Sequence, residues 1–171
     1  MRIETDRLVL NLHALADFGE FAAMWADPET VRFIGGKPGT RQESWMRLLR
    51  YRGLWPLLGY GYWAVHEKAS GRFAGDVGFA DFHRDADPGI DGIPEAGWVL
   101  APWARGKGFA AEAIAAALAW LDGQGFEKSV CIIDAENTPS LRLAEKVGYG
   151  SPSTMTLSNA PITLLTRPRP Q

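Results

Sequence analysis

The feature that most constrains this chain is a junction between a strand and a helix beyond its middle. The apolar run 95–100 predicts a strand, and the alanine-rich segment 108–121 carries an apolar stripe at helical spacing. Between them, Gly106 and Gly108 let the backbone turn sharply and approach a ligand closely. Amides at a helix start are unpaired and lie at the positive end of the helix dipole. With basic side chains on both sides of Gly106, the junction predicts a site for a pyrophosphate-bearing ligand.

The rest of the chain alternates predicted strands and helices. Apolar–polar alternation and short apolar runs predict strands over 7–12, 60–67, 72–83, 95–100, 129–134 and 162–166. Apolar spacing and capping boxes at Asp17–Glu20 and Thr40–Glu43 predict helices over 17–26, from Thr40 to the residue before Pro56, over 108–121 and from Thr138 to a glycine cap at Gly148. Segments 32–39 and 84–94 are predicted loops, and 167–171 a frayed tail. This order predicts one α/β (α+β) domain over residues 1–171.

Composition excludes several classes of protein. With 46% apolar and 22% charged residues, the chain has the makeup of a folded globular domain rather than a disordered one. Its longest apolar run, Ala113–Leu121, is too short to span a membrane, and the N-terminus lacks the apolar stretch of a signal peptide. The single Cys131 cannot form an internal disulfide, so we expect a cytoplasmic protein. The net charge of −2 argues against nucleic acid as a partner.

The glycine junction also matches a different class of cofactor site. Residues 106–111 have the form G-x-G-x-x-A after a strand, and Asp134 follows the next strand, as in dinucleotide-binding folds. The stretch after Asp134 is too short for the remaining strands of such a fold. Because the motif matches but the remaining stretch is short, an NAD(P)-dependent oxidoreductase is kept only as the alternative.

Three motifs in order resemble the GNAT superfamily of acetyl-coenzyme A-dependent N-acetyltransferases. Residues 105–110 have the form R-x-x-G-x-A, and residues 137–149 contain N-x-x-S followed by E-K-x-G-Y. The opening residues 4–10 look like those of ribosomal-protein N-terminal (alanine/serine) acetyltransferases. The resemblance implies a mixed, mostly antiparallel central sheet with a splayed strand pair, flanked by helices. It also implies transfer of an acetyl group from acetyl-CoA, as cosubstrate, to a primary amine.

The resemblance assigns roles to particular positions. The loop that binds the coenzyme A pyrophosphate corresponds to Arg105, Gly106, Lys107, Gly108, Phe109 and Ala110. The strand that pairs with the pantetheine arm corresponds to Trp98, Val99 and Leu100. Asn137 matches an asparagine that contacts this arm, and Ser140 matches a serine near the thiol. Many members carry a tyrosine acid at the position of Ala144, so here Ser140 or water must protonate the leaving thiolate.

The chemistry requires a deprotonated amine, which points to a base. Glu95 begins the strand that holds the acetyl end, where the family often has a carboxylate, and is the candidate base. His66 and His83 are weaker candidates. With no nucleophile in evidence, we expect direct attack in a ternary complex rather than an acetyl-enzyme, and Cys131 is expected to be inert core.

The acceptor amine is the least constrained part of the prediction. The acidic residues Asp81, Asp85, Asp87 and Asp91 could attract a cationic amine, or form only a solvated loop. Trp45, Tyr51 and Trp55 lie where the family borders its acceptor site, or serve packing alone. The acceptor could be a protein N-terminus or a small molecule; no metal, nucleic acid or membrane is expected, and homodimers are common among relatives. A coenzyme A-binding module without catalysis remains a further alternative.

Overall fold

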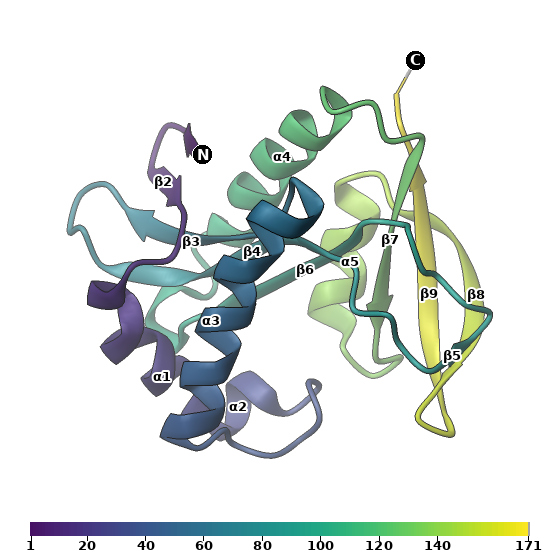
Figure 1. Ribbon diagram of the computed structural model, residues 1–171, viewed down its shortest axis with the longest axis horizontal. Coiled ribbons are helices and arrows are strands. Elements are labelled where there is room, and N and C mark those ends of the chain that lie inside the picture. Colours follow the sequence, from purple (N-terminus) through teal and green to yellow (C-terminus); the bar gives the residue numbers. More distant parts are fainter. Residues whose placement is uncertain (171) are drawn as a thin grey trace.

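A computed structural model of the protein describes residues 1–170, which form a nine-stranded sheet with helices on both faces (Figure 1). The strands are β1 (Arg2–Glu4), β2 (Leu8–Asn11), β3 (Tyr62–Glu67), β4 (Phe73–Ala80), β5 (Ala86–Asp87), β6 (Glu95–Leu100), β7 (Lys128–Ile133), β8 (Gly150–Leu157) and β9 (Ala160–Pro168). The α-helices are α1 (Phe18–Ala26), α2 (Pro28–Val31), α3 (Arg41–Leu58), α4 (Phe109–Asp122) and α5 (Thr138–Lys146). Among the described residues, none of these helices has the length and apolarity needed to span a membrane.

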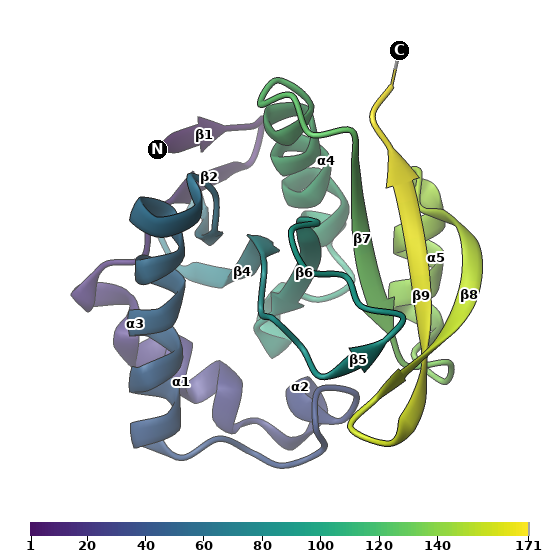
Figure 2. The ribbon, with the colours of Figure 1, turned by 45° about the vertical axis from the view of Figure 1, so that its right-hand side comes forward.

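The sheet is mixed and mostly antiparallel, as expected. Its order is β1-β2-β3-β4-β6-β7-β9-β8-β5, and within the described chain only β6 and β7 run parallel. These two strands pair at a single position, Glu95 with Val130, and then diverge (Figure 2). A dinucleotide-binding fold requires a mostly parallel sheet, so this topology overturns the oxidoreductase alternative.

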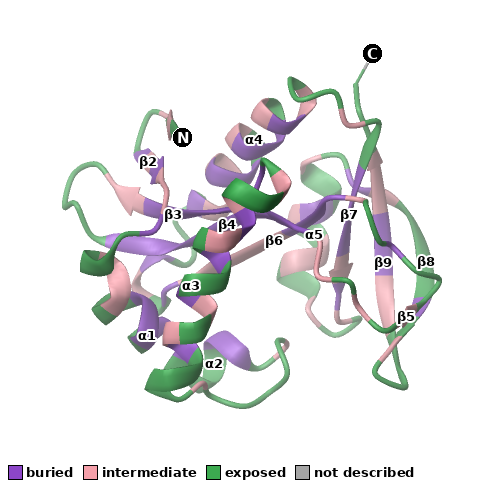
Figure 3. Ribbon diagram, in the orientation of Figure 1, coloured by how far each residue is buried: buried purple, intermediate pink, exposed green. Residues whose placement is uncertain are grey.

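The two faces of the sheet carry separate parts of the core. Helices α1 and α3 pack on one face over β3 and β4, while α4 and α5 pack on the other over β2, β4, β6 and β7. Since β4 is covered on both faces, every one of its residues is buried, whereas much of β8 near the sheet edge is exposed (Figure 3). The helix predicted at 108–121, α4, thus packs against both β4 and β6.

Of the two capping boxes expected from the sequence, the one at the start of α3 forms and the one at the start of α1 does not. The box at Thr40 is confirmed, because Glu43 N–H donates to Thr40 Oγ1 at 3.2 Å and Thr40 N–H donates to Glu43 Oε2 at 2.7 Å. The box expected at Asp17 is wrong. Its carboxylate accepts instead from the Ala14 amide, and Glu20 accepts from the Phe73 amide, so both side chains anchor neighbouring segments.

The expected end of α3 before Pro56 is also wrong. The helix continues to Leu58 and ends at Gly59, whose φ of +77° provides the left-handed cap. Pro56 removes one hydrogen bond in the last turn. The neighbouring Trp55 offsets this loss, since it packs against Trp63 and donates its indole N–H to the Tyr62 carbonyl at 3.1 Å.

Only part of the C-terminal hairpin, β8–β9, was expected from the sequence. Strand β8 was missed, because its residues are mostly polar and, apart from Met155, poorly buried. Strand β9 runs beyond the expected strand at 162–166 and includes Arg167 and Pro168, so the frayed tail expected over 167–171 is wrong for these residues, while Gln171 lies outside the described residues. Arg167 forms a two-point ion pair with Asp122 at 2.7 and 2.8 Å, and the Arg169 amide donates to the Glu127 carbonyl.

The partly buried carboxylate of Glu112 joins the N-terminal segment to the start of α4. Glu112 accepts from the Thr5 hydroxyl at 2.6 Å, from the Arg7 amide at 2.9 Å and from the Arg7 guanidinium at 2.7 Å. The same guanidinium donates to the Lys107 carbonyl in the glycine loop at 2.9 Å. Burial alone would raise the pKa of Glu112, but these bonds outweigh it and hold the pKa below its usual range.

Glu112→Gln should lower the free energy of unfolding at pH 7 by about 2 kcal/mol, because charge-assisted hydrogen bonds are lost. Since the pKa is lower in the folded than in the unfolded state, the ionised carboxylate stabilises the fold above pH 4.5, and this contribution is lost as the pH falls through the folded pKa. Urea denaturation at several pH values should show the gap between variant and wild type closing in acid. The exposed Glu145→Gln is the control; a pH-independent gap would contradict the assignment.

Candidate active site

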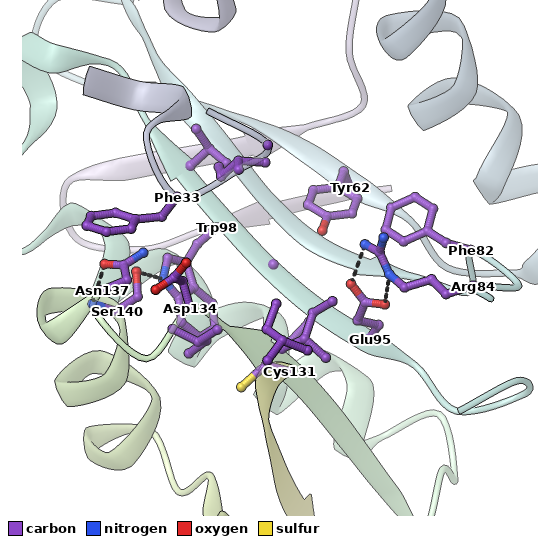
Figure 4. A pocket seen from close by; sticks show the side chains of 18 of the residues that line it. Phe33, Tyr62, Phe82, Arg84, Glu95, Trp98, Cys131, Asp134, Asn137 and Ser140 are labelled. Atoms are coloured by element: carbon purple, nitrogen blue, oxygen red, sulfur yellow. Dashed lines mark hydrogen bonds and ion pairs between the residues drawn. The ribbon is translucent and has the colours of Figure 1, made fainter. Parts of the chain in front are cut away.

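A cavity of about 350 Å³ occupies the gap that opens where β6 and β7 diverge (Figure 4). Its walls come from strands β3, β6 and β7, helices α1 and α3, the start of α5, the segments 33–35 and 82–84, and the β8–β9 hairpin. At one end, called here the α5 end, lie Trp98, Asp134, Asn137 and Ser140. At the other, the α3 end, lie Arg47, Arg50, Tyr51, Tyr62, Phe82, Arg84 and Glu95.

Strand β6 presents one free edge to this cavity. Its other edge pairs with β4 along the whole strand, from Glu95 opposite Ala80 to Leu100 opposite Gly75. Beyond Glu95, β7 no longer pairs with it, and Trp98 and Val99 line the cavity. An extended ligand could therefore add to this edge through backbone hydrogen bonds, as a strand would.

The glycine loop has the geometry of an anion site. A short 3₁₀ turn (Pro102–Ala104) leads into Gly106 and Gly108, whose φ values are +74° and +78°, and α4 begins at Phe109. Left-handed residues before a helix turn successive amides toward one point, where the helix dipole also favours negative charge. The backbone of this loop thus fits a pyrophosphate group.

The two basic side chains of the loop differ from expectation. The Arg105 guanidinium turns toward α2, where it donates to Asp27 and to the Thr30 hydroxyl, and its Nε donates to the Leu100 carbonyl. It therefore braces α2 against β6 rather than lying over the loop. Lys107 rests its ammonium 4.7 Å from the centre of the Trp103 ring.

The α5 end brings together the residues that the N-x-x-S motif singled out. Asn137 caps α5, since its side-chain oxygen accepts from the Ser140 amide at 3.3 Å. The Trp98 indole N–H donates to Ser140 Oγ at 3.4 Å (Figure 4), which leaves the serine proton available for another acceptor. Ala144 is fully buried in the core, so no hydroxyl takes the place of the family's tyrosine there.

Glu95 lies at the α3 end in a buried ion pair. Its residue is 4% exposed, and both carboxylate oxygens accept from Arg84, at 2.7 and 2.8 Å (Figure 4). Burial would lower the pKa of Arg84, but the hydrogen bonds and negative charge of Glu95 outweigh it and raise the pKa. A proton could reach Glu95 only on a lone pair that Arg84 leaves free, or after this pair loosens.

Two stacked tyrosines line the same end. Tyr51 and Tyr62 have ring centres 4.3 Å apart at an angle of 8°. Gly97 makes room for the Tyr62 hydroxyl, because a Cβ at this position would clash with it. Burial raises the pKa of both phenols well above the usual range, so both stay protonated at neutral pH. Tyr62 escaped sequence reasoning, because its apolar ring fits strand alternation equally well.

Several candidates named from the sequence do not line the cavity. His66 bonds to Asp17 at 2.9 Å, and the acidic residues of the 81–91 segment all lie elsewhere. Asp81 instead accepts from the His83 and Gly92 amides and shapes its own loop. Of the three aromatic residues suggested for the acceptor side, Tyr51 lines the cavity, but Trp45 and Trp55 do not. Attraction of a cationic amine by this loop is therefore not supported.

The described residues contain one free thiol, Cys131, and one group of possible metal ligands. Burial raises the pKa of the Cys131 thiol, which disfavours the reactive thiolate. Asp81, His83 and Asp91 bring ligand atoms within 4.8 Å of one another on an exposed loop, outside the cavity. Exposed acidic groups often gather in this way without a metal.

Comparisons with known proteins agree with this geometry. A family model described as an acetyltransferase (GNAT) domain matches residues 7–150. A structure from Bordetella pertussis assigned to the GNAT-family acetyltransferases is 35% identical, with a TM-score of 0.84, over 98% of this chain and 99% of that one. The uncharacterized protein YkkB of Bacillus subtilis is 28% identical over 97% of this chain and 95% of its own length.

The fold is shared more widely than the sequence. A ribosomal-protein α-N-acetyltransferase in complex with coenzyme A has a TM-score of 0.79 at 13% identity, over 98% of both chains. The family match, the 35% identical relative and the splayed sheet lead to one conclusion: this chain belongs to the GNAT family of acetyl-CoA-dependent N-acetyltransferases.

Proposed function

We propose that this protein transfers the acetyl group of acetyl-CoA to a primary amine by direct attack in a ternary complex. The observation that carries this proposal is the single cavity along the free edge of β6, with Ser140 at one end and Glu95 at the other. One cavity of this kind holds both reactants side by side, which is what direct transfer needs.

Acetyl-CoA would be held mainly by backbone groups. The amides of 105–110 would bind its pyrophosphate, and Trp98, Val99 and Leu100 would pair with the pantetheine arm, beside Asn137. The coenzyme A complex of the ribosomal-protein acetyltransferase with the same fold supports this cosubstrate. Because these contacts are mostly backbone, the geometry of Gly106 and Gly108 matters more than the charge of Arg105.

The acceptor must lose a proton before it attacks. At neutral pH this costs about 4–5 kcal/mol for a lysine-type amine and about 1 kcal/mol for an α-amine. Glu95 would accept this proton, directly or through water, while Arg84 holds its carboxylate in place. The cost is small for an α-amine, so even a partly engaged carboxylate suffices.

The leaving thiolate must be neutralised. Ser140 would donate a hydrogen bond to the departing sulfur, or pass on its hydroxyl proton while taking one from water, and the indole N–H of Trp98 would keep the oxygen in place. The high pKa of Cys131 supports transfer without an acetyl-enzyme. The remaining alternative is a module that binds coenzyme A without catalysis; it predicts tight binding and no acetylation of any amine.

Calorimetry should show acetyl-CoA binding and no detectable NAD binding, because the glycine loop belongs to a mostly antiparallel sheet. Gly106→Val should weaken acetyl-CoA binding at least tenfold, since its φ of +74° is strained for a branched side chain. Gly89→Val, on a surface loop with open space around it, is the control. Binding of NAD alone would refute the proposal.

Glu95→Gln should lower kcat by about 100-fold and flatten the low-pH limb of the rate profile, because the base is removed. Rates are measured by coenzyme A release between about pH 5 and 9. Acetyl-CoA affinity and circular dichroism report whether Arg84, left without its charge partner, disturbs the fold. An unchanged rate and profile would make Glu95 purely structural.

Ser140→Ala should slow turnover by about tenfold and change the Kd for acetyl-CoA by less than about threefold, because the hydroxyl is needed at thiolate departure. Ser153→Ala, on the exposed part of β8, is the matched control. Weaker binding with an unchanged kcat would argue against the acid role.

A further inference from the structure

The α3 end of the cavity collects positive charge that the fold does not neutralise. Three arginines, Arg47, Arg50 and Arg84, line it, against one carboxylate, Glu95. Because Glu95 is paired with Arg84 at two points, these two charges cancel. The other cavity carboxylate, Asp134, lies at the α5 end (Figure 4). The α3 end therefore carries two guanidinium groups that form no ion pair among the described residues.

Arg47 and Arg50 come from one face of α3, three residues apart. The Arg47 guanidinium lies 3.7 Å from the centre of the Trp25 ring. Arg50 and Arg84 both lie over the Phe82 ring, at 5.2 and 4.7 Å, so this ring lies between Arg50 and the Glu95 ion pair or beside both.

Neither guanidinium has a carboxylate within 4.0 Å among residues 1–170. The nearest acid along the helix, Glu43, is engaged in the capping box. The buried Asp76, on β4 beneath Trp25, has its oxygens bound by His13 at 2.7 Å and the Trp25 indole at 3.0 Å.

Packing alone does not account for this pair. Aromatic contact satisfies the flat face of a guanidinium but leaves its in-plane N–H donors free to bind an anion at two points. Burial lowers the pKa of Arg47, and the nearby negative charges of Asp76 and Glu43 do not offset this, so the Arg47 guanidinium gains from a further anion in the cavity. The guanidinium groups of Arg47 and Arg50 in the cavity wall therefore fit a ligand with an anionic group.

We propose that the acceptor is a small primary amine that carries an anionic group, a carboxylate or a phosphate, which Arg47 and Arg50 bind while the amine lies toward Glu95. This inference rests on the proposed acetyl transfer and narrows its substrate. A cavity of about 350 Å³, shared with the acetyl end of the cosubstrate, suits an amino acid or a molecule of similar size. Polyamines and aminoglycosides are disfavoured, because their extra ammonium groups would face the arginines.

The test compares matched amines in the coenzyme A release assay. The pairs are amino acids with their carboxamides, and 2-aminoethyl phosphate with ethanolamine, alongside spermidine. We expect kcat/KM for the anionic member of at least one pair to exceed that of its neutral partner by about 10–100-fold, as for a lost charge-assisted contact. The pair that shows the effect identifies the anion.

Arg50→Gln and Arg47→Gln should each raise KM for the anionic amine by about tenfold or more, with kcat within about twofold and KM for the neutral partner unchanged. Arg47 packs on Trp25 at 3.7 Å, whereas Arg50 lies farther from Phe82, at 5.2 Å, so Arg50→Gln disturbs packing less and is the cleaner variant. Arg52→Gln, on the same helix but exposed and outside the cavity, is the control.

The outcomes separate the two proposals. Equal rates for charged and neutral partners, or a preference for spermidine, would overturn the anionic acceptor and leave acetyl transfer standing. An equal loss for both members of a pair in Arg50→Gln would also overturn it, since the arginine would then act on the fold. Acetyl-CoA binding without acetylation of any amine would overturn the proposed function and this inference with it.

Discussion

The divergence of β6 from β7 is the constraint on which the rest of the site depends. Because the two strands pair only at Glu95 and Val130, the free edge of β6 and the start of α5 face a common gap. The pairing of β6 with β4 and the packing of α4 beneath keep β6 in place despite that missing neighbour. A continuous sheet would bury the same backbone groups in strand pairing and leave no space for a ligand.

The role of each charged side chain in this protein depends on where it lies, not on the net charge. The net charge of −2 does not show that some charged side chains stabilise the fold while others line the cavity. Arg105 and Glu112 are structural ties, which fasten α2 and the N-terminal strands to the region of the glycine loop. Arg47 and Arg50 line the cavity and form no ion pair among the described residues, so they place positive charge on its wall. The backbone supplies the electrostatics of the glycine loop.

Local signals predicted the fold where the physical cause was itself local. The capping box at Thr40 and the glycine-to-helix junction depend on residues a few positions apart, and both occur as expected. The errors arose where distant contacts override local preference. Trp55 packing carries α3 past Pro56, β7 and Asp122 hold the end of β9, and the carboxylate of Asp17 is drawn to another amide.

The sequence by itself determined the family, the order of the main elements and the residues of the glycine loop and of α5, because spacing along the chain carries that information. Only the tertiary structure decided which side chains share the cavity. It brings Arg47 and Arg50 of α3 to the same cavity as Arg84 and Glu95, which it pairs, and it leaves the acidic side chains of the 81–91 segment outside. These contacts join residues far apart in the chain, so their charges acquire a common role only when packing brings the segments together.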